Sequence, residues 1–285
     1  MANRQTLLFI GGGMETVPGI RKARAMGLQV VVSDMNPQAP GILAADAGLI
    51  ASTYDVAATV AVARDYHRSV RPLDGVMCLA TDVPLTVATV AAELGLPGIP
   101  VAVAARAMDK LAMKEKFVAD GVPVPWFQPV ASAAHLRQLV ARQGLPLVIK
   151  PVDSRGARGV LRLTPDVDLD WAYAHAADNS PTGRVMVEAY LAGPQLSTEA
   201  LLVDGAGVTP GFCDRNYEYL ERFAPYIIEN GGSHPSCLPD AARAAVADCA
   251  LRAARSLGIT TGIAKGDMVW TADGPKVIEI GRAHV

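Results

Sequence analysis

The apolar and polar positions of the first hundred residues alternate between two kinds of segment. Short apolar runs at residues 7–10, 30–34 and 75–79 predict strands, and the stretch after Gly13 and residues 57–70 and 85–94 predict helices. Gly27 and Gly95 are expected to end two of these helices, because glycine adopts a positive φ without steric cost. Apolar strands that alternate with helices favour an α/β fold with a doubly wound parallel sheet.

The pattern changes after residue 95. Residues 96–100 have the sequence LPGIP and are typical of a link, after which a helix is expected at about 103–120. Prolines at 123 and 125 then impose an extended chain. Strands and helices mix from there on, and the last long helix is expected at 241–257, with Asp240 as its N-cap and Gly258 at its end.

We therefore predict three units along the chain. They cover residues 1–105, a doubly wound unit; residues 106–190, a central α+β unit; and residues 191–285, a second α+β unit.

Composition narrows the class of protein. Of the 285 residues, 51% are hydrophobic and only 5% aromatic, which suits buried parallel strands and alanine-rich helices. The net charge of −2 provides no basic surface for nucleic acid, and no apolar run is long enough for a membrane span. There is no signal-peptide pattern, and the four cysteines are scattered. We expect a cytoplasmic protein that binds neither nucleic acid nor membrane, and the composition is compatible with a homo-oligomer.

A glycine-rich turn follows the first strand at residues 11–13. With Asp34 at the end of the second strand, it suggests a dinucleotide site. However, Thr16 stands where that motif needs a small residue, and Glu15 would place a negative charge beside a pyrophosphate. We expect a tight strand-to-helix turn that contacts a different small molecule.

A basic strand end and a flexible loop form the next candidate site. Lys150 lies near the end of a predicted strand, and a loop with Ser154, Gly156 and Gly159 follows it. The lysine offers a point charge for phosphate oxygens, and the loop can fold its backbone N–H groups over the same phosphates. Glycines permit the close approach that a side chain would block. The alternative is an ordinary hairpin with a solvated basic tip.

Acidic residues mark two further positions. Glu188 ends a predicted strand, where it and the neighbouring backbone could bind an adenine; the alternative is an exposed glutamate. Asp267 and Glu279 lie on the two strands of a predicted hairpin. Two carboxylates that face each other can hold Mg²⁺ while phosphates fill its other positions. A solvated acidic face is the alternative.

Taken in order, these residues resemble the ATP-grasp superfamily of carboxylate–amine ligases and carboxylase relatives, which includes the large chain of carbamoyl-phosphate synthase. The resemblance runs from Leu7 to Glu279, and the N-terminal unit, with Asp34, Asn36 and Pro37, resembles the pre-ATP-grasp domain. It implies a pre-ATP-grasp domain followed by a two-part ATP-grasp domain, incomplete at its C-terminal end.

The resemblance also implies roles for individual residues. Lys114 and Lys150 would bind the phosphates of ATP, and residues 154–159 would form a mobile loop over them. The residues implied to hold adenine are Glu188, Tyr190 and Leu191, and those implied to hold Mg²⁺, or Mn²⁺ in its place, are Asp267 and Glu279.

Two further positions carry expectations of their own. Gln195 stands where many relatives have the acid that binds the ribose hydroxyls, and glutamine can still accept a hydrogen bond. Arg215 is a candidate for the γ-phosphate or a substrate carboxylate, because guanidinium binds both bidentately, with a surface salt bridge as the alternative.

The implied function is that of an ATP-dependent ligase. Such an enzyme converts a small-molecule carboxylate into an acylphosphate, which an amine or similar nucleophile then attacks, releasing ADP and phosphate. Lys150 and Arg215 would be the catalytic residues. The alternatives are a carboxylase-type relative that activates bicarbonate, and a nucleotide-binding protein without catalytic activity.

The end of the chain departs from the family pattern, which continues beyond Glu279; Gly281 occupies the position of an expected asparagine. The codons GAG-ATC-GGA-AGA-GCA-CAC-GTC would encode the last seven residues, and from their second base they resemble a widely used sequencing adapter. We therefore expect residues 280–285 to be artefactual, and the chain as written to be truncated, poorly soluble and inactive. Robust ATP turnover by the 285-residue chain would contradict this.

Overall fold

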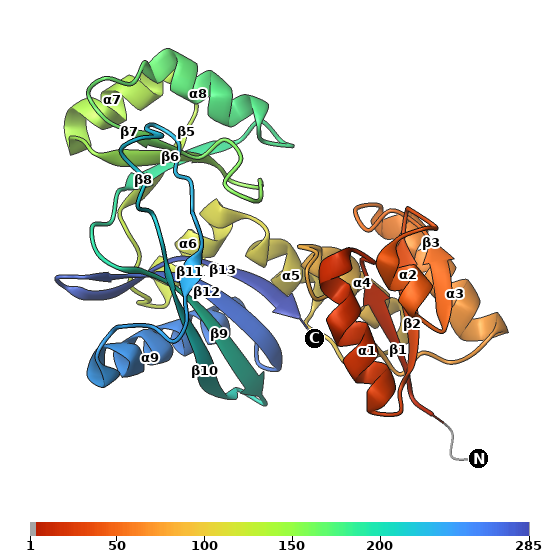
Figure 1. The fold of residues 1–285 in the computed structure, drawn as a ribbon. Coiled ribbons are helices and arrows are strands. Elements are labelled where there is room, and N and C mark those ends of the chain that lie inside the picture. The colour runs from red at the N-terminus through yellow and green to blue at the C-terminus, as the bar shows by residue number, and fades with distance from the viewer. Residues whose placement is uncertain (1–3, 285) are drawn as a thin grey trace.

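The computed structural model describes residues 4–284, with side chains up to residue 281, and it contains three β-sheets (Figure 1). One sheet lies in the N-terminal part of the chain and is parallel. The other two are antiparallel and belong to the central and C-terminal parts. This arrangement confirms the predicted fold class, a doubly wound unit followed by two α+β parts.

The N-terminal sheet has the strand order β3-β2-β1-β4. Its strands are β1 (Thr6–Ile10), β2 (Gln29–Asp34), β3 (Ala47–Ile50) and β4 (Gly75–Met77), and its helices are η1 (Met14–Thr16), α1 (Val17–Ala25), α2 (Pro40–Ala44), α3 (Val56–Ser69) and α4 (Pro84–Leu94). Neighbouring residues Leu8 and Phe9 of β1 belong to two different buried clusters. Both faces of the sheet are therefore covered, which explains why its strands are continuously apolar.

The single helix expected at 103–120 is wrong, because the structure has two helices there. They are α5 (Val101–Ala107) and α6 (Lys110–Ala119). Asp109 separates them, and its carboxylate accepts hydrogen bonds from the N–H groups of Leu111 and Ala112 at 3.0 Å. An aspartate that satisfies the first free N–H groups starts a new helix more favourably than it continues an old one.

The central sheet has the order β5-β8-β6-β7. Its strands are β5 (Phe127–Val130), β6 (Leu147–Pro151), β7 (Leu161–Leu163) and β8 (Val185–Ala189), and its helices are α7 (Ala133–Gln143) and α8 (Leu169–Asp178). Ile149 and Val187 pack in one buried cluster with residues of both helices. Because side chains alternate along a strand, Lys150 and Glu188 lie on the opposite face. The face of the central sheet away from α7 and α8 turns toward the C-terminal sheet (Figure 1).

The C-terminal sheet has the order β11-β10-β9-β12-β13. Its strands are β9 (Gln195–Val203), β10 (Ala206–Arg215), β11 (Gly232–Ser233), β12 (Gly262–Thr271) and β13 (Gly274–His284), and α9 (Asp240–Leu257) covers it. Asp240 is the first residue of α9 and not its N-cap, because the chain turns at Pro239 and the Asp240 carboxylate pairs with Arg243 instead. Gly258 ends the helix as expected, with φ +94°.

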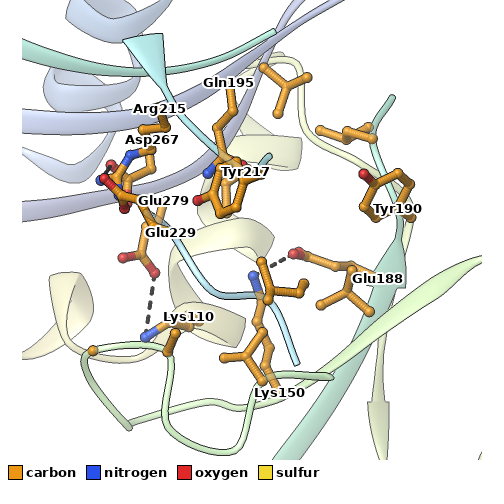
Figure 2. Close-up of a pocket in the computed structure, with 18 of the residues that line it drawn as sticks. Lys110, Lys150, Glu188, Tyr190, Gln195, Arg215, Tyr217, Glu229, Asp267 and Glu279 are labelled. Carbon is orange, nitrogen blue, oxygen red and sulfur yellow. Dashed lines mark hydrogen bonds and ion pairs between the residues drawn. The ribbon is translucent and has the colours of Figure 1, made fainter. Parts of the chain in front are cut away.

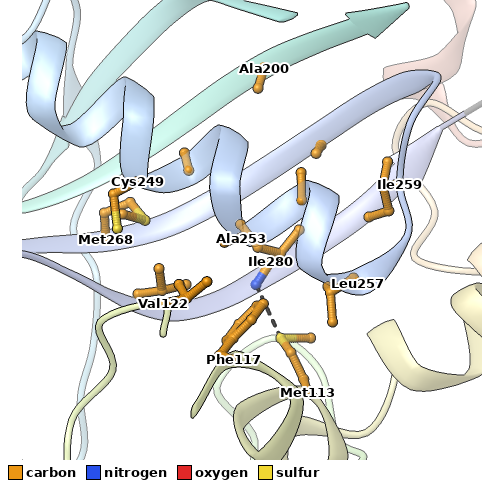
Figure 3. Close-up of a cluster of buried hydrophobic side chains, with 14 of the residues drawn as sticks. Met113, Phe117, Val122, Ala200, Cys249, Ala253, Leu257, Ile259, Met268 and Ile280 are labelled. Carbon is orange, nitrogen blue, oxygen red and sulfur yellow. Dashed lines mark hydrogen bonds between the residues drawn. The ribbon is translucent and has the colours of Figure 1, made fainter. Parts of the chain in front are cut away.

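The largest buried cluster joins α5, α6 and α9 to the C-terminal sheet (Figure 3). Phe117 of α6 packs here with Leu257 and Met268. Ile280, the first residue of the expected artefactual tail, also belongs to this cluster, with 1% of its surface exposed. Its N–H group points at the sulfur of Met113, 3.3 Å away. The core therefore fixes the start of α6 against the last strand, and both contribute to the cleft described next.

Within residues 4–284, none of the helices combines the length and the apolar character that a membrane crossing needs.

Candidate active site

A cleft of about 900 Å³ lies between the central and C-terminal sheets (Figure 2). Its walls come from segments that are far apart in the sequence, namely α6, β6, β8, the loop after β6, the linker after β8, and strands β10, β12 and β13. The volume lies at the upper end of the range for small-molecule sites. The cleft is rich in charged side chains, and their partners define what it can bind.

Glu188 forms a buried ion triad with two lysines. Its carboxylate accepts a hydrogen bond from Lys150 Nζ on the neighbouring strand and lies 2.9 Å from Lys114 Nζ on α6. Lys114 is 0% exposed, and this burial, only partly offset by Glu188, lowers its pKa to about 8. Burial opposes ionisation of Glu188, but the two ammonium groups outweigh it and hold its pKa below the ordinary value.

The loop between β6 and β7 is fixed at its base. Lys110 Nζ donates a hydrogen bond to the carbonyl of Ser154 at 2.8 Å. Arg155 reaches the N-terminal unit, where its guanidinium lies 4.9 Å from the Tyr54 ring centre and 3.8 Å from Asp82. The loop backbone therefore stands over the cleft beside Lys110 and Lys150.

Two glycines of this loop have positive φ for different reasons. Gly156 has φ +62° and open space around it, which leaves its backbone accessible. Gly159 has φ +74°, and a Cβ atom there would stand 2.7 Å from Asn179 Cβ. Gly156 is thus suited to contact with a ligand, and Gly159 to packing.

The linker after β8 forms another wall of the cleft. It carries Tyr190 and Leu191 and leads to Gln195 at the start of β9, all of which line the cleft. Gly193 brings this linker close to β12, since a Cβ atom on it would lie 2.1 Å from the Trp270 carbonyl oxygen. An aromatic and an aliphatic side chain beside polar backbone can accommodate a flat heterocycle.

Asp267 and Glu279 are directly opposite each other on β12 and β13. Each has a basic partner, because Arg215 Nη2 lies 2.6 Å from Asp267 Oδ1 and Lys110 Nζ lies 3.4 Å from Glu279 Oε2. Burial opposes ionisation of Glu279, but Lys110, Lys150 and Lys114 together lower its pKa to about 2. Burial and the nearby Glu279 raise the pKa of Asp267 above its ordinary value.

This acid pair fits a divalent cation only with help from a ligand. In the described part of the chain, no group of three or more histidine, cysteine, aspartate or glutamate side chains is arranged to hold a metal ion. Two carboxylates supply hard oxygen ligands of the kind that Mg²⁺ prefers, and phosphate oxygens can supply others. The residues present therefore fit Mg²⁺ bound together with a phosphate-bearing ligand.

The comparison with protein families identifies this architecture. Residues 20–98 match the ATP-grasp N-terminal domain, and residues 107–282 match the ATP-grasp domain. The chain belongs to the ATP-grasp family. The resemblance deduced from the sequence is thereby confirmed.

Two curated proteins are similar in sequence. The uncharacterized protein y4rH of Sinorhizobium fredii is 30% identical over 262 residues, which cover 85% of this chain and 52% of the relative. The D-alanine–D-alanine ligase of Bordetella petrii is 34% identical over 191 residues, covering 63% of this chain and 56% of that enzyme. The chain thus spans little more than half the length of either relative.

A solved ATP-grasp structure shares the fold. The L-amino acid ligase from Bacillus licheniformis aligns with 99% of this chain and 67% of its own, with a TM-score of 0.81 and 23% identity. At 23% identity, this similarity shows that the two chains share a fold and shows nothing further.

The structure brings most of the residues singled out in the sequence into the ATP-grasp cleft. Those that line it are Lys150, Ser154, Gly156, Glu188, Tyr190, Leu191, Gln195, Arg215, Asp267 and Glu279. Lys114 is not in the lining and sits behind Glu188, and Gly159 packs at the back of its loop.

The burial of the charged side chains bears on the alternatives that the sequence left open. Lys150 and Glu188 are buried, so neither is a solvated strand-end charge. The Arg215 side chain is 12% exposed, and it pairs with the exposed Glu229 as well as with Asp267. The salt bridge that was the alternative is thus present, and it lies in the wall of the cleft. In the N-terminal unit, Asp34 Oδ2 accepts a hydrogen bond from Gly12 N at 2.8 Å. That carboxylate therefore stabilises the glycine-rich turn itself.

Sequence reasoning missed several cleft residues. Lys110 contacts both the loop and Glu279, and it could have been found because it precedes Lys114 by one helical turn on α6. Tyr217, Glu229 and Lys265 also line the cleft. Burial and the negative charges of Glu229 and Asp267, only partly offset by Arg215, raise the pKa of Tyr217 to about 12. No sequence pattern marked these three.

Proposed function

We propose that this protein is an ATP-dependent ligase that joins a small-molecule carboxylate to an amine. The observation that carries the proposal is the pair Asp267 and Glu279, opposed across β12 and β13 in the same cleft as Lys110 and Lys150. Family membership and relatives that are named as ligases support it.

In the proposed complex, ATP lies along the cleft. Tyr190 and Leu191 hold the adenine, and Gln195 accepts a hydrogen bond from the ribose. Glu188, which was also expected at the adenine, has its carboxylate paired with Lys150 and Lys114, so we assign the adenine contacts to the linker alone. Lys150 and the backbone of the loop at Ser154 and Gly156 bind the phosphates. Lys114, behind Glu188, contributes its charge from a distance and does not touch the ligand.

Asp267 and Glu279 are the proposed ligands of Mg²⁺, or of Mn²⁺ in its place. A cation held there beside the phosphates would neutralise part of the negative charge on the phosphate oxygens. In the structure, Lys110 pairs with Glu279 and Arg215 pairs with Asp267. We propose that both basic side chains pair with phosphate oxygens instead when the nucleotide and the cation bind.

The chain's contribution to the reaction is positioning and electrostatic stabilisation. An oxygen of the substrate carboxylate attacks the γ-phosphorus, and ADP leaves. Lys150 and Arg215 stabilise the negative charge on the phosphoryl group during this transfer. The amine then attacks the carbonyl carbon of the acylphosphate, and phosphate leaves. No covalent bond to the enzyme is needed.

An ADP-release assay of the whole protein against pools of carboxylates and amines tests the proposal. We expect release that requires one acid and one amine together and that Lys150→Ala reduces at least about 100-fold, in line with the loss of a transition-state contact. Lys116→Ala is the matched control, because Lys116 lies on α6 and pairs only with Asp120 among the contacts described.

Two outcomes would contradict the ligase proposal. ADP release that depends on bicarbonate would instead support a carboxylase-type enzyme. Nucleotide binding without ADP release from any combination would support a protein that binds nucleotide and does not catalyse ligation.

A further inference from the structure

Residues 216–231, here called the strap, connect β10 to β11 by a long excursion. The strap leaves the C-terminal sheet, reaches β7 at the edge of the central sheet and returns (Figure 1). At its base the two ends pair, since Asn216 N donates to the Gly231 carbonyl at 2.8 Å and Asn230 N to the Asn216 carbonyl at 3.0 Å. The strap therefore joins the two sheets that enclose the cleft.

The far end of the strap binds the free edge of β7. Leu161 and Tyr226 form an antiparallel bridge, and Arg162 N donates to the Pro225 carbonyl at 2.8 Å. An edge strand offers unpaired N–H and C=O groups, which an extended segment can satisfy. The Tyr226 ring also meets Trp171 and His175 of α8 edge to face, with centroids 6.4 and 5.9 Å away.

Arg162 is the side chain that connects this attachment to the cleft. Its guanidinium makes two hydrogen bonds of 2.8 Å to the carboxylate of Glu221 in the strap. The same group lies 5.5 Å from the ring centre of Tyr190, in the linker on the other side. The Arg162 side chain is only 13% exposed, whereas Glu221 is 79% exposed. The Arg162 side chain is therefore fixed by its surroundings, and the exposed Glu221 of the strap binds to it.

Both partners of Arg162 belong to segments that line the cleft. Tyr190 forms part of the linker wall, and the strap contributes Tyr226 and Ile228 to the lining. Arg162 itself is not in the lining. One guanidinium behind the two walls therefore fixes the position of both, and a bidentate pair has the directional geometry for that task.

We infer that Arg162 is a positioning residue of the nucleotide cleft, which holds Tyr190 in one wall and the strap in the other. The inference rests on the proposed function, because it takes a nucleotide to be the ligand of the cleft. It predicts that the strap opens more often, and that nucleotide binds more weakly, when the contact between Arg162 and Glu221 is lost.

Limited chymotrypsin digestion of the whole protein measures strap opening without any ligand. Tyr219 and Phe223 are exposed aromatic residues of the strap, so cleavage after them reports on that segment, and exchanging Arg162 and Glu221 adds and removes no aromatic residue. We expect Arg162→Glu and Glu221→Arg each to raise the rate of this cleavage about fivefold, the effect of an ion pair at the strong end of the surface range. The double charge swap should return the rate to within about twofold of wild type.

Calorimetric titration with Mg²⁺ and AMP-PNP measures the consequence for the nucleotide. Each single variant should weaken binding about fivefold, and the swap should restore it. The matched control is the exchange of Arg64 and Glu93, a pair at 2.8 Å in the N-terminal unit, which should change neither readout. Circular dichroism checks that every variant is folded.

The possible failures are distinguishable. If wild type does not bind AMP-PNP, the proposed function is refuted. If wild type binds AMP-PNP and the single variants match it in cleavage and in affinity, the inference about Arg162 is refuted. If the single variants are cleaved faster and bind AMP-PNP more weakly, but the double swap restores neither property, Arg162 has a general structural role. That result would also overturn the inference.

Discussion

Replacing Glu188 by glutamine removes the one negative charge between two buried lysines. The carboxylate bonds to Lys150 and lies 2.9 Å from Lys114, which is fully buried. Removing one partner of a buried ion pair costs about 3–5 kcal/mol, because the remaining charge is left uncompensated. Lys114 can avoid part of this cost by releasing its proton, since burial already lowers its pKa to about 8. We therefore expect Glu188→Gln to lower the free energy of unfolding by about 3 kcal/mol at neutral pH.

The pH dependence of this loss has a definite sign. In wild type below about pH 7, Lys114 is protonated in both the folded and the unfolded chain, so it adds little slope. In the variant the folded chain holds Lys114 neutral while the unfolded chain binds the proton. Stability of the variant therefore rises with pH by about 1.4 kcal/mol per unit, and the gap to wild type narrows between about pH 6 and pH 8.

Urea unfolding of both proteins at several pH values, followed by tryptophan fluorescence and circular dichroism, measures the gap. Glu115→Gln is the matched control, because Glu115 is an exposed residue of α6, and it should change stability by less than about 0.5 kcal/mol. A Glu188→Gln variant within about 1 kcal/mol of wild type, or a gap that widens with pH, would refute the ion-triad reasoning.

Three further tests apply the same unfolding measurement to other parts of the structure. Gly159→Ala should cost at least about 1 kcal/mol more than Gly156→Ala, because both have positive φ but only Gly159 lacks room for a Cβ atom; equal losses would contradict this. The pKa of Glu279 lies at about 2, below its ordinary 4.5, so its stabilisation is present above about pH 4.5 and is lost as pH falls toward 2; Glu279→Gln should remove about 3 kcal/mol at neutral pH and flatten this acid dependence. Phe117→Ala should cost about 3–5 kcal/mol, since its ring is fully buried, and a loss under 1 kcal/mol would show that the core can close around the gap.

The N-terminal sheet was predictable because its signals are local. Apolar strands are followed by helices that end at glycine, and the structure places β1, β2 and β4 at or near the predicted positions. The prediction failed at Asp109, where one helix becomes two. Periodicity continues across that residue, although the family resemblance has Asp109 and Lys110 open the central helix, and the capping hydrogen bonds of the Asp109 carboxylate show the break.

The cleft was predictable only where a residue type and its position in a strand were both unusual. Lys150 meets that condition, since it is the one charge in an otherwise apolar strand. Asp267 meets it as the one acid in its strand, directly opposite Glu279. Tyr217 and Glu229 lie in the strap, and a long irregular segment gives no periodicity from which to deduce what it faces. Their place in the cleft depends on the contact between the strap and β7, which joins residues more than 60 positions apart in the sequence.

The central claim is that the protein activates a carboxylate by phosphorylating it. Once the ADP-release screen identifies a substrate acid, turnover of that acid labelled with ¹⁸O in its carboxylate tests the claim directly by mass spectrometry of the released phosphate. If an acylphosphate forms and an amine then displaces phosphate from carbon, the phosphate must carry one labelled oxygen from the acid. Unlabelled phosphate, with the displaced carboxylate oxygen found in water or in AMP, would contradict the account.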